Sequence, residues 1–383
     1  MASDTLKFCA VGDVTAFHKE PETGYEFVGP VLAEMDVVVA QNERHYTTRR
    51  DIYPGGGFTE LCDPENAKAL LLGNYDVFTF ASNHGMDLGP DVMLGTIEVL
   101  RDLGFQVIGS GANIEEARRP AFVEKKGVKI GFLSYCSVLR RNYQAGETNA
   151  GSAPMRAYTL YEQTDYQPGT APKVLTFPYQ DDLDAMLEDI RTVKAQCDIL
   201  SVSCHWGLHG VTGALAMYQP EVAHKAIDAG ADVIVGTHPH RLKGIEIYKG
   251  APIFYSLGNF CFDQPRWALD EGRRRSPEHK AHMDSQRDWT YDPEYEEWYA
   301  IPPENRKSML VRMDVDTKTK KITRLCYLPI MINKRAQPQI LDAGDPQFDD
   351  VVSYVREVTD SQQFETVYTV EGNEVLINLG TET

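Results

Sequence analysis

An α/β fold is predicted for this chain on three observations. Short apolar runs rich in β-branched residues alternate with helical stretches over the first two thirds of the sequence. The runs are apolar throughout, which is typical of strands buried on both faces. With 383 residues, 42% of them hydrophobic and 25% charged, the chain can bury a large core. These proportions exclude a disordered, collagen-like or coiled-coil protein.

Eight strands are expected from the apolar runs. They cover residues 8–14, 37–41, 77–81, 107–109, 130–135, 199–204, 233–236 and 253–256. Helices are expected between them at residues 63–73, 90–103, 182–195 and 219–229. The first two begin at Asp63-Pro64 and Pro90 because proline is favoured in the first turn of a helix.

The last third of the chain predicts hairpins and one helix. Residues 309–315 and 322–328 flank a polar turn and predict a hairpin. A helix at 349–358 and a hairpin turning at 371–373 follow. We expect one elaborated domain over 1–335, with 336–383 as a C-terminal extension packed on it.

Two polar segments interrupt this pattern. Residues 140–178 are rich in Tyr, Gly, Pro and Thr, and predict an excursion from the core. Residues 263–307 contain three tryptophans and the run Arg273-Arg274-Arg275. Because such long loops in compact domains are usually functional or disordered, 263–307 is either a candidate lid or a solvated surface insertion.

The charge and cysteine content limit the partners and the compartment. The formal net charge is −18, so the surface repels nucleic acid and anionic membranes. A negatively charged substrate therefore needs a local positive site, such as metal ions or arginines. Seven cysteines without a CxxC pair indicate reduced thiols, and the N-terminal residues contain no leader-like apolar run, so we expect a cytoplasmic protein.

Polar residues follow five of the predicted strands. The carboxyl ends of the strands in an α/β sheet form the usual ligand site. The residues delivered there are Asp13, Glu43, Asn83 with His84, His205, and His238 with His240.

Each of these residues also has a purely structural explanation. Asp13 can cap a turn, His84 can bond a backbone carbonyl, and His205 can be a half-buried core residue. The segment His238-Pro239-His240 is the strongest local signal, since an extended X-Pro segment places both imidazoles on one side. The joint occurrence at five strand ends favours a shared site.

A mixture of carboxylate, amide and imidazole ligands predicts transition-metal ions. This set suits Mn, Zn or Fe, whereas Mg and Ca favour oxygen ligands alone. One tetrahedral ion cannot use so many ligands. Two divalent ions about 3.5–4 Å apart, sharing a bridging carboxylate, fit them better. The predicted ligands are Asp13, Glu43, Asn83, His205, His238 and His240.

These motifs resemble the poly-γ-glutamate capsule synthesis protein (CapA) family of the calcineurin-like metallophosphoesterase superfamily. The resemblance covers about residues 7–263 and is most specific between Asp228 and Asp263. It implies a calcineurin-like metallophosphoesterase fold, a central β-sandwich flanked by helices, with a dinuclear site at its edge. The hairpins near the C-terminus would extend this fold.

The resemblance also implies individual roles. Asp13 looks like the first-motif aspartate, Glu43 the bridging carboxylate, and Asn83 the amide ligand. His205, His238 and His240 look like imidazole ligands, and His84 like a proton donor. The chain departs from the superfamily in its first motif, where Asp13 is followed by Val14-Thr15. Superfamily members usually carry Asp-x-His there, so one ion lacks a ligand, takes it from His18 or His45, or binds weakly.

The leading functional hypothesis is a metal-dependent hydrolase acting on a small or oligomeric anionic substrate. His84 would donate a proton to the leaving group and Asp87 would orient its imidazole. The family name implies a γ-glutamyl amide bond, and the superfamily a phosphoester. Alternatives are an acyl transferase or a non-catalytic capsule-polymer binding protein. We expect one of two roles for four arginines of the candidate lid. They pair with carboxylates of the substrate, or they belong to a solvated surface insertion; the four are Arg266, Arg273, Arg274 and Arg275.

Overall fold

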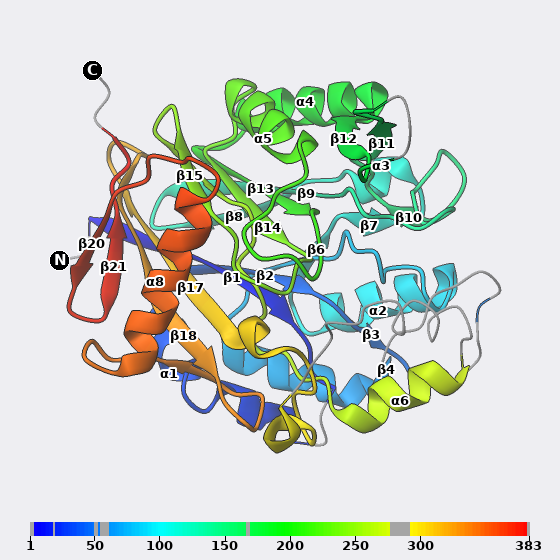
Figure 1. Ribbon diagram of the computed structural model, residues 1–383, viewed down its shortest axis with the longest axis horizontal. Helices are drawn as coiled ribbons and strands as arrows, with labels where there is room; N and C mark the ends of the chain where they lie inside the picture. The colour runs from blue at the N-terminus through cyan, green and yellow to red at the C-terminus, as the bar shows by residue number, and fades with distance from the viewer. Residues whose placement is uncertain are drawn as a thin grey trace.

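The structure is a computed structural model that describes residues 4–17, 20–49, 53, 61–165, 169–275 and 292–380. Two β-sheets pack face to face, and helices cover their outer faces (Figure 1). The predicted class, an α/β fold with a central β-sandwich flanked by helices, is confirmed.

The larger sheet has nine strands in the described part of the chain, and its long path runs in the order β20-β21-β18-β17-β1-β2-β5-β6, with β19 beside β18. Its strands are β1 (Thr5–Val14), β2 (Val37–Asn42), β5 (Val77–Thr79), β6 (Gln106–Ile108), β17 (Lys307–Asp316), β18 (Ile322–Ile332), β19 (Pro338–Ile340), β20 (Tyr368–Glu371) and β21 (Glu374–Ile377). Neighbours from β1 to β6 are parallel, so their carboxyl ends share one edge.

The second sheet runs β15-β16-β14-β13-β9-β8. Its strands are β8 (Ala121–Lys125), β9 (Val128–Cys136), β13 (Ile199–His205), β14 (Val233–Thr237), β15 (Ile245–Tyr248) and β16 (Ala251–Phe254). Three small two-stranded sheets join β3 (His45–Tyr46) to β4 (Leu61–Cys62), β7 (Ser110–Gly111) to β10 (Gly151–Ser152), and β11 (Ala157–Glu162) to β12 (Lys173–Pro178).

The helices lie over the outer faces of the two sheets and at the edge of the sandwich. Their bounds are α1 (Gly29–Leu32), α2 (Pro90–Asp102), α3 (Ile114–Ala117), α4 (Gln180–Lys194), α5 (Tyr218–Asp228), α6 (Arg266–Arg275) and α8 (Pro346–Asp360), with 3-10 helices η1 (Pro21–Tyr25), η2 (Pro64–Gly73), η3 (Pro293–Tyr295) and η4 (Pro303–Arg306). In Figure 1, α4 and α5 lie over the second sheet, and α1 and α2 lie over the first. Among the described residues, no helix combines the length and the apolar content that a membrane crossing requires.

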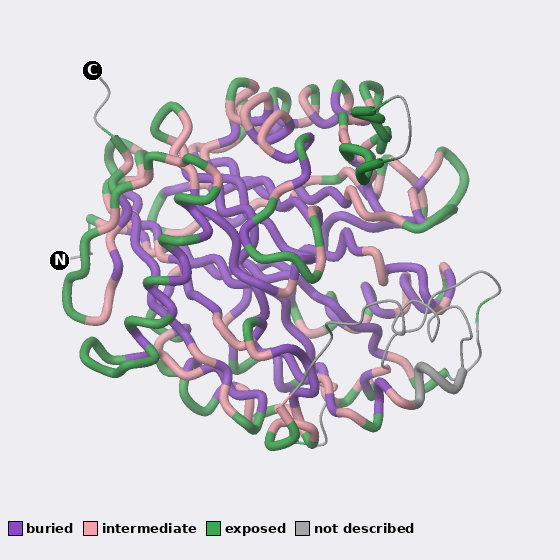
Figure 2. Tube along the Cα trace, in the orientation of Figure 1, coloured by how far each residue is buried: buried purple, intermediate pink, exposed green. Residues whose placement is uncertain are grey.

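The main core lies between the two sheets. Phe8 of β1 meets Phe132 of β9 edge to face, with ring centroids 5.7 Å apart. Val351 and Val355 of α8 belong to the same buried cluster, so this helix closes the edge of the sandwich. Burial follows the strands of both sheets, whereas the β11–β12 hairpin is exposed (Figure 2).

The secondary structure follows the prediction closely, with one difference in helix type. Each of the eight predicted strands has a counterpart, and the hairpins β17–β18 and β20–β21 form as expected. The segment predicted as a helix at 63–73 is a 3-10 helix, because apolar spacing of three to four residues does not distinguish the two types. The division between 1–335 and 336–383 stays a prediction, although β21 pairs with β18.

Candidate metal centre

The site forms where the two sheets meet. Asp13, near the end of β1, bridges to Asn259, which follows β16 of the other sheet. The Asp13 amide donates to the Gly258 carbonyl (3.0 Å), and the Phe260 amide donates to the Asp13 carbonyl (2.8 Å). This pairing brings the strand ends of both sheets to one place.

The predicted ligands at the ends of β1, β2 and β13 form a tight buried cluster. Ligand atoms of Asp13, Glu43 and His205 all lie within 4.8 Å of one another. His205 Nε2 is 3.2 Å from Glu43 Oε1 and 2.8 Å from Asn83 Oδ1. These four side chains come from separate segments, so the sheet edge assembles the cluster.

The two histidines after β14 also reach the cluster, although not as an extended segment. His238 and His240 have φ values of 95° and 53°, both in the left-handed region. The prediction of an extended His238-Pro239-His240 is therefore wrong, because consecutive bends turn the chain here. The His238 ring lies 4.9 Å from the His205 ring, and His240 Nδ1 is 3.3 Å from Asp13 Oδ2. Such strained backbone is typical of functional sites.

The cluster fits a divalent cation. Both carboxylate oxygens of Asp13, Oε1 of Glu43 and Nδ1 of His238 are buried without a hydrogen-bond partner among the described residues. Buried polar atoms are costly unless something satisfies them. All four atoms are metal-ligand types, and the mixed oxygen and nitrogen set suits Mn, Zn or Fe.

The electrostatics of the cluster point the same way. Burial, and then the neighbouring Asp13, raise the pKa of Glu43 to about 7. Burial lowers the pKa values of His205 and His238 well below the usual range, so both imidazoles are neutral, as metal ligands must be. Burial also acts to lower the pKa of His240, but the neighbouring Asp13 carboxylate raises it overall. A cation would relieve the repulsion between the two carboxylates.

His84 lies beside the cluster in a fixed orientation. Its Nδ1 donates to Asp87 Oδ2 (2.6 Å), and the Tyr143 hydroxyl donates to Asp87 Oδ1 (2.7 Å). Asp87 is fully buried, which excludes the alternative of a solvated turn residue. Burial acts to raise the pKa of Asp87, but His84, the charge of Arg140 and the hydrogen bond from Tyr143 lower it overall. An ionised Asp87 keeps the proton on Nδ1 of His84.

The sequence offered His18 and His45 as additional metal ligands, and the structure describes only His45. His45 donates from Nε2 to the His84 carbonyl (2.8 Å), and its Nδ1 lies 3.4 Å from Thr96 Oγ1. Its imidazole therefore supports the His84 backbone and is occupied by these contacts. Burial lowers the pKa of His45 to about 4. His18 lies outside the described residues.

Two further residues complete the surroundings of the cluster. Asn259 Oδ1 accepts from His240 Nδ1 (2.7 Å). The His209 ring stacks on His238 at 3.9 Å, and its Nε2 donates to the His238 carbonyl (2.6 Å). Asn259 follows a predicted strand, so the strand-end rule could have found it. His209 lies in a glycine-containing loop and carries no local signal.

The arginines predicted to bind substrate are only partly described. Arg266 begins α6, and its Nε pairs with Asp270 at 3.0 Å. Arg273, Arg274 and Arg275 belong to the same helix, but their side chains lie outside the described residues. A role for these four in substrate binding stays a prediction.

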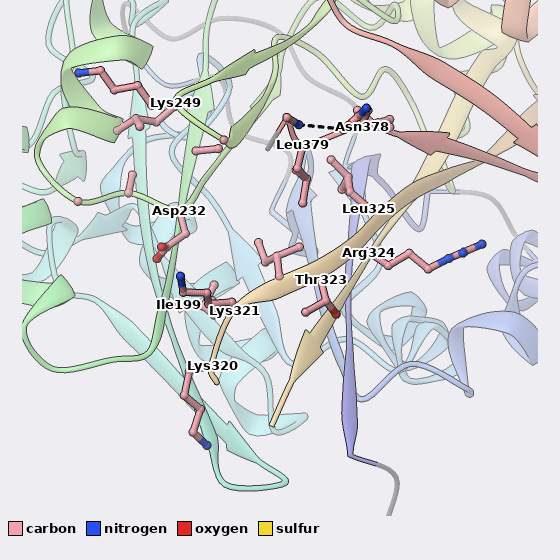
Figure 3. A pocket seen from close by; sticks show the side chains of 18 of the residues that line it. Ile199, Asp232, Lys249, Lys320, Lys321, Thr323, Arg324, Leu325, Asn378 and Leu379 are labelled. Carbon is pink, nitrogen blue, oxygen red and sulfur yellow. Dashed lines mark hydrogen bonds between the residues drawn. The ribbon is translucent and has the colours of Figure 1, made fainter. Parts of the chain in front are cut away.

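A large cavity lies at the opposite ends of the strands (Figure 3). Its volume is about 1160 Å³, and Ile199, Asp232 and Ala251, at the starts of β13, β14 and β16, help to line it. Asp232 is already paired with Lys194 (2.7 Å) and accepts from the Leu200 amide (2.7 Å). None of the residues that line this cavity belongs to the candidate metal centre.

Sequence comparison identifies relatives of this chain. The family profile described as "Bacterial capsule synthesis protein PGA_cap" matches residues 8–264. The PGA biosynthesis protein CapA of Bacillus subtilis (strain 168) is 28% identical over 273 residues, which cover 69% of this chain and 65% of that protein. The capsule biosynthesis protein CapA of Bacillus anthracis is 29% identical over 200 residues, covering 52% and 43%. The matches thus span less than two thirds of these relatives.

Shape comparison finds more distant likenesses. The calcineurin-like phosphoesterase YfkN from Bacillus subtilis has a TM-score of 0.45 and 12% identity, covering 93% of this chain and 97% of that one. A phosphatase from Mycoplasma pneumoniae has a TM-score of 0.46 and 15% identity, covering 85% and 94%.

Proposed function

The chain belongs to the bacterial capsule synthesis protein PGA_cap family, and from this premise we propose that it is a metal-dependent hydrolase of a γ-glutamyl-type amide bond. The observation that carries the proposal is the buried group of Asp13, Glu43 and His205 beside the His84–Asp87 pair. A site that only bound metal would not need an oriented imidazole next to its ligands.

The residues divide the chemical work. Two divalent ions, Mn, Zn or Fe, would supply Lewis acidity and a water of lowered pKa when bound. The residues that would hold these ions are Asp13, Glu43, Asn83, His205, His238 and His240. Because Asp87 keeps a proton on Nδ1 of His84, the leaving amine takes its proton from Nε2. His84 gives this proton as an imidazolium protonated on both nitrogens and ends as the neutral ring protonated on Nδ1.

The proposal also names the bond that the hydrolase cleaves. The Bacillus subtilis relative is named a PGA biosynthesis protein, which motivates a γ-glutamyl amide for this chain. The same arrangement of carboxylates and imidazoles also suits a phosphoester, which is our second candidate. A transferase and a non-catalytic polymer-binding protein remain outcomes of the test.

Metal content tests the site directly. We expect about two transition-metal ions per chain in protein purified without chelator, and fewer in His240→Ala. His224→Ala is a matched control, since His224 pairs with Glu246 (2.8 Å) outside the cluster. If the wild type binds no Mn, Zn or Fe even after soaking, the hydrolase proposal is wrong.

Turnover then separates the candidate reactions. A γ-glutamyl p-nitroanilide and bis-p-nitrophenyl phosphate would be offered to the metal-loaded protein in parallel, with and without an amine acceptor. Release of p-nitroaniline without acceptor supports the amide hydrolase, and cleavage of the phosphate diester alone supports the phosphoesterase. Turnover that requires the acceptor indicates a transferase, and metal binding with no turnover of either compound favours a binding protein.

A further inference from the structure

His240 is the first member of a chain of buried hydrogen bonds that leads away from the metal centre. Its Nδ1 lies 2.7 Å from Asn259 Oδ1, and Asn259 Nδ2 donates to the Tyr299 hydroxyl (2.7 Å). The Tyr299 hydroxyl donates in turn to the Asn305 carbonyl. Asn259 and Tyr299 are 0% exposed and Asn305 is 3% exposed, so water does not compete for these bonds.

The last acceptor sets the direction of every bond in this chain. A backbone carbonyl can only accept a hydrogen bond, so the Tyr299 hydroxyl must donate its single proton to the Asn305 carbonyl. The Tyr299 oxygen is then an acceptor, and the amide of Asn259 must turn its NH₂ group toward it. The amide oxygen of Asn259 therefore faces His240.

This direction determines which nitrogen of His240 carries a proton. Asn259 Oδ1 accepts from this nitrogen, and the carboxylate oxygen Asp13 Oδ2 lies 3.3 Å from it. Nδ1 of His240 must be protonated to face both, which leaves the lone pair on Nε2 for an ion. Metal-ligating histidines are generally oriented through the other ring nitrogen in this way.

Tyr299 is itself held firmly in place. The Gln264 amide donates to the Trp298 carbonyl (2.9 Å), and the Ala300 amide donates to the Gln264 carbonyl (2.8 Å), so both neighbours of Tyr299 are tied to Gln264. Arg241 Nε donates to Asn305 Oδ1 (2.9 Å), which fixes the far end. Without Tyr299, the Asn259 amide would be able to rotate and offer its NH₂ group to His240.

We propose that Tyr299 is a positioning residue for metal binding, and that the segment 292–307 is a fixed support of the metal centre. This inference rests on the proposed function only in requiring that the site binds a divalent ion. It assigns part of the predicted lid segment a role in holding His240. An opening motion of residues 299–305 would break the hydrogen bonds that orient this ligand.

The test compares metal affinities of conservative variants. Zn²⁺ or Mn²⁺ affinity of the full chain, stripped of metal, would be measured by competition with a chromophoric chelator. We expect Tyr299→Phe to bind about 10–100-fold more weakly, as loss of such a supporting contact usually causes. Tyr327→Phe is the matched control, because the Tyr327 hydroxyl is buried without a hydrogen-bond partner in the described part of the chain, and its affinity should be unchanged.

A double-mutant cycle distinguishes positioning from general destabilisation. If Tyr299 acts through Asn259, the double variant Tyr299→Phe with Asn259→Ala should bind metal no more weakly than Asn259→Ala alone. Additive losses, or an unchanged affinity in Tyr299→Phe, would overturn the inference. A wild type that binds metal but cleaves neither chromogenic compound would contradict the proposed function and leave this inference to be decided by the affinities.

Discussion

Gly12 of β1 offers the sharpest test of how the two sheets are joined. A Cβ atom added at Gly12 would lie 1.9 Å from the Gly258 carbonyl oxygen and 2.8 Å from its carbon. Both are backbone atoms, so no side-chain rotation relieves the clash. Gly12→Ala must therefore push the two segments apart by about 1 Å.

The expected cost follows from the contacts at this junction. The bonds from the Asp13 amide to Gly258 and from the Phe260 amide to Asp13 would be broken or stretched. Two such bonds are worth about 2 kcal/mol, and the overpacking adds about 1–3 kcal/mol. We expect Gly12→Ala to lose about 3–5 kcal/mol of unfolding free energy.

Equilibrium urea unfolding of the metal-free protein measures this loss. Gly95→Ala in α2 is the matched control, because a Cβ there meets no heavy atom within 4 Å. Alanine is the better helix former, so this control should gain up to about 1 kcal/mol. If Gly12→Ala is as stable as the wild type within about 0.5 kcal/mol, the tight junction beside Asp13 is not as described.

Three further predictions concern catalysis, metal binding and pH. His84→Ala should lower turnover by about two to four orders of magnitude without changing metal content, and unchanged turnover would remove His84 from the mechanism. Metal at about 100 times its dissociation constant should stabilise the wild type by about 2.7 kcal/mol, and Glu43→Gln should lose most of this gain in thermal unfolding. Burial, followed by the charge of Arg241, lowers the pKa of Lys243 from 10.5 to about 8. Between pH 8 and 10.5 the unfolded chain therefore binds more protons than the folded chain. Burial of the Lys243 charge lowers the unfolding free energy by its full amount below pH 8, and this loss disappears as the pH rises. Relative to Lys243→Met, the wild type should gain about 3 kcal/mol from pH 7 to 10.5 in urea titrations, and a pH-independent difference would contradict the assigned shift.

Local patterns predicted the strands and the residues at their ends. Strands such as β2 and β14 are buried on both faces, which favours the runs of apolar side chains that make them visible in the sequence. Parallel strands place their carboxyl ends at one edge, so Glu43 and His205 could be assigned to one site before their distance was known.

The hydrogen bonds that orient the site residues could not be predicted, because no local sequence pattern encodes them. Tyr299 meets Asn259 across 40 positions of sequence, and Tyr143 meets Asp87 across 56. These contacts form only when the segments that carry the residues pack together in the fold. Hydrophobic periodicity reports which face of an element is buried, whereas the partner of a buried hydroxyl is a property of the assembled fold.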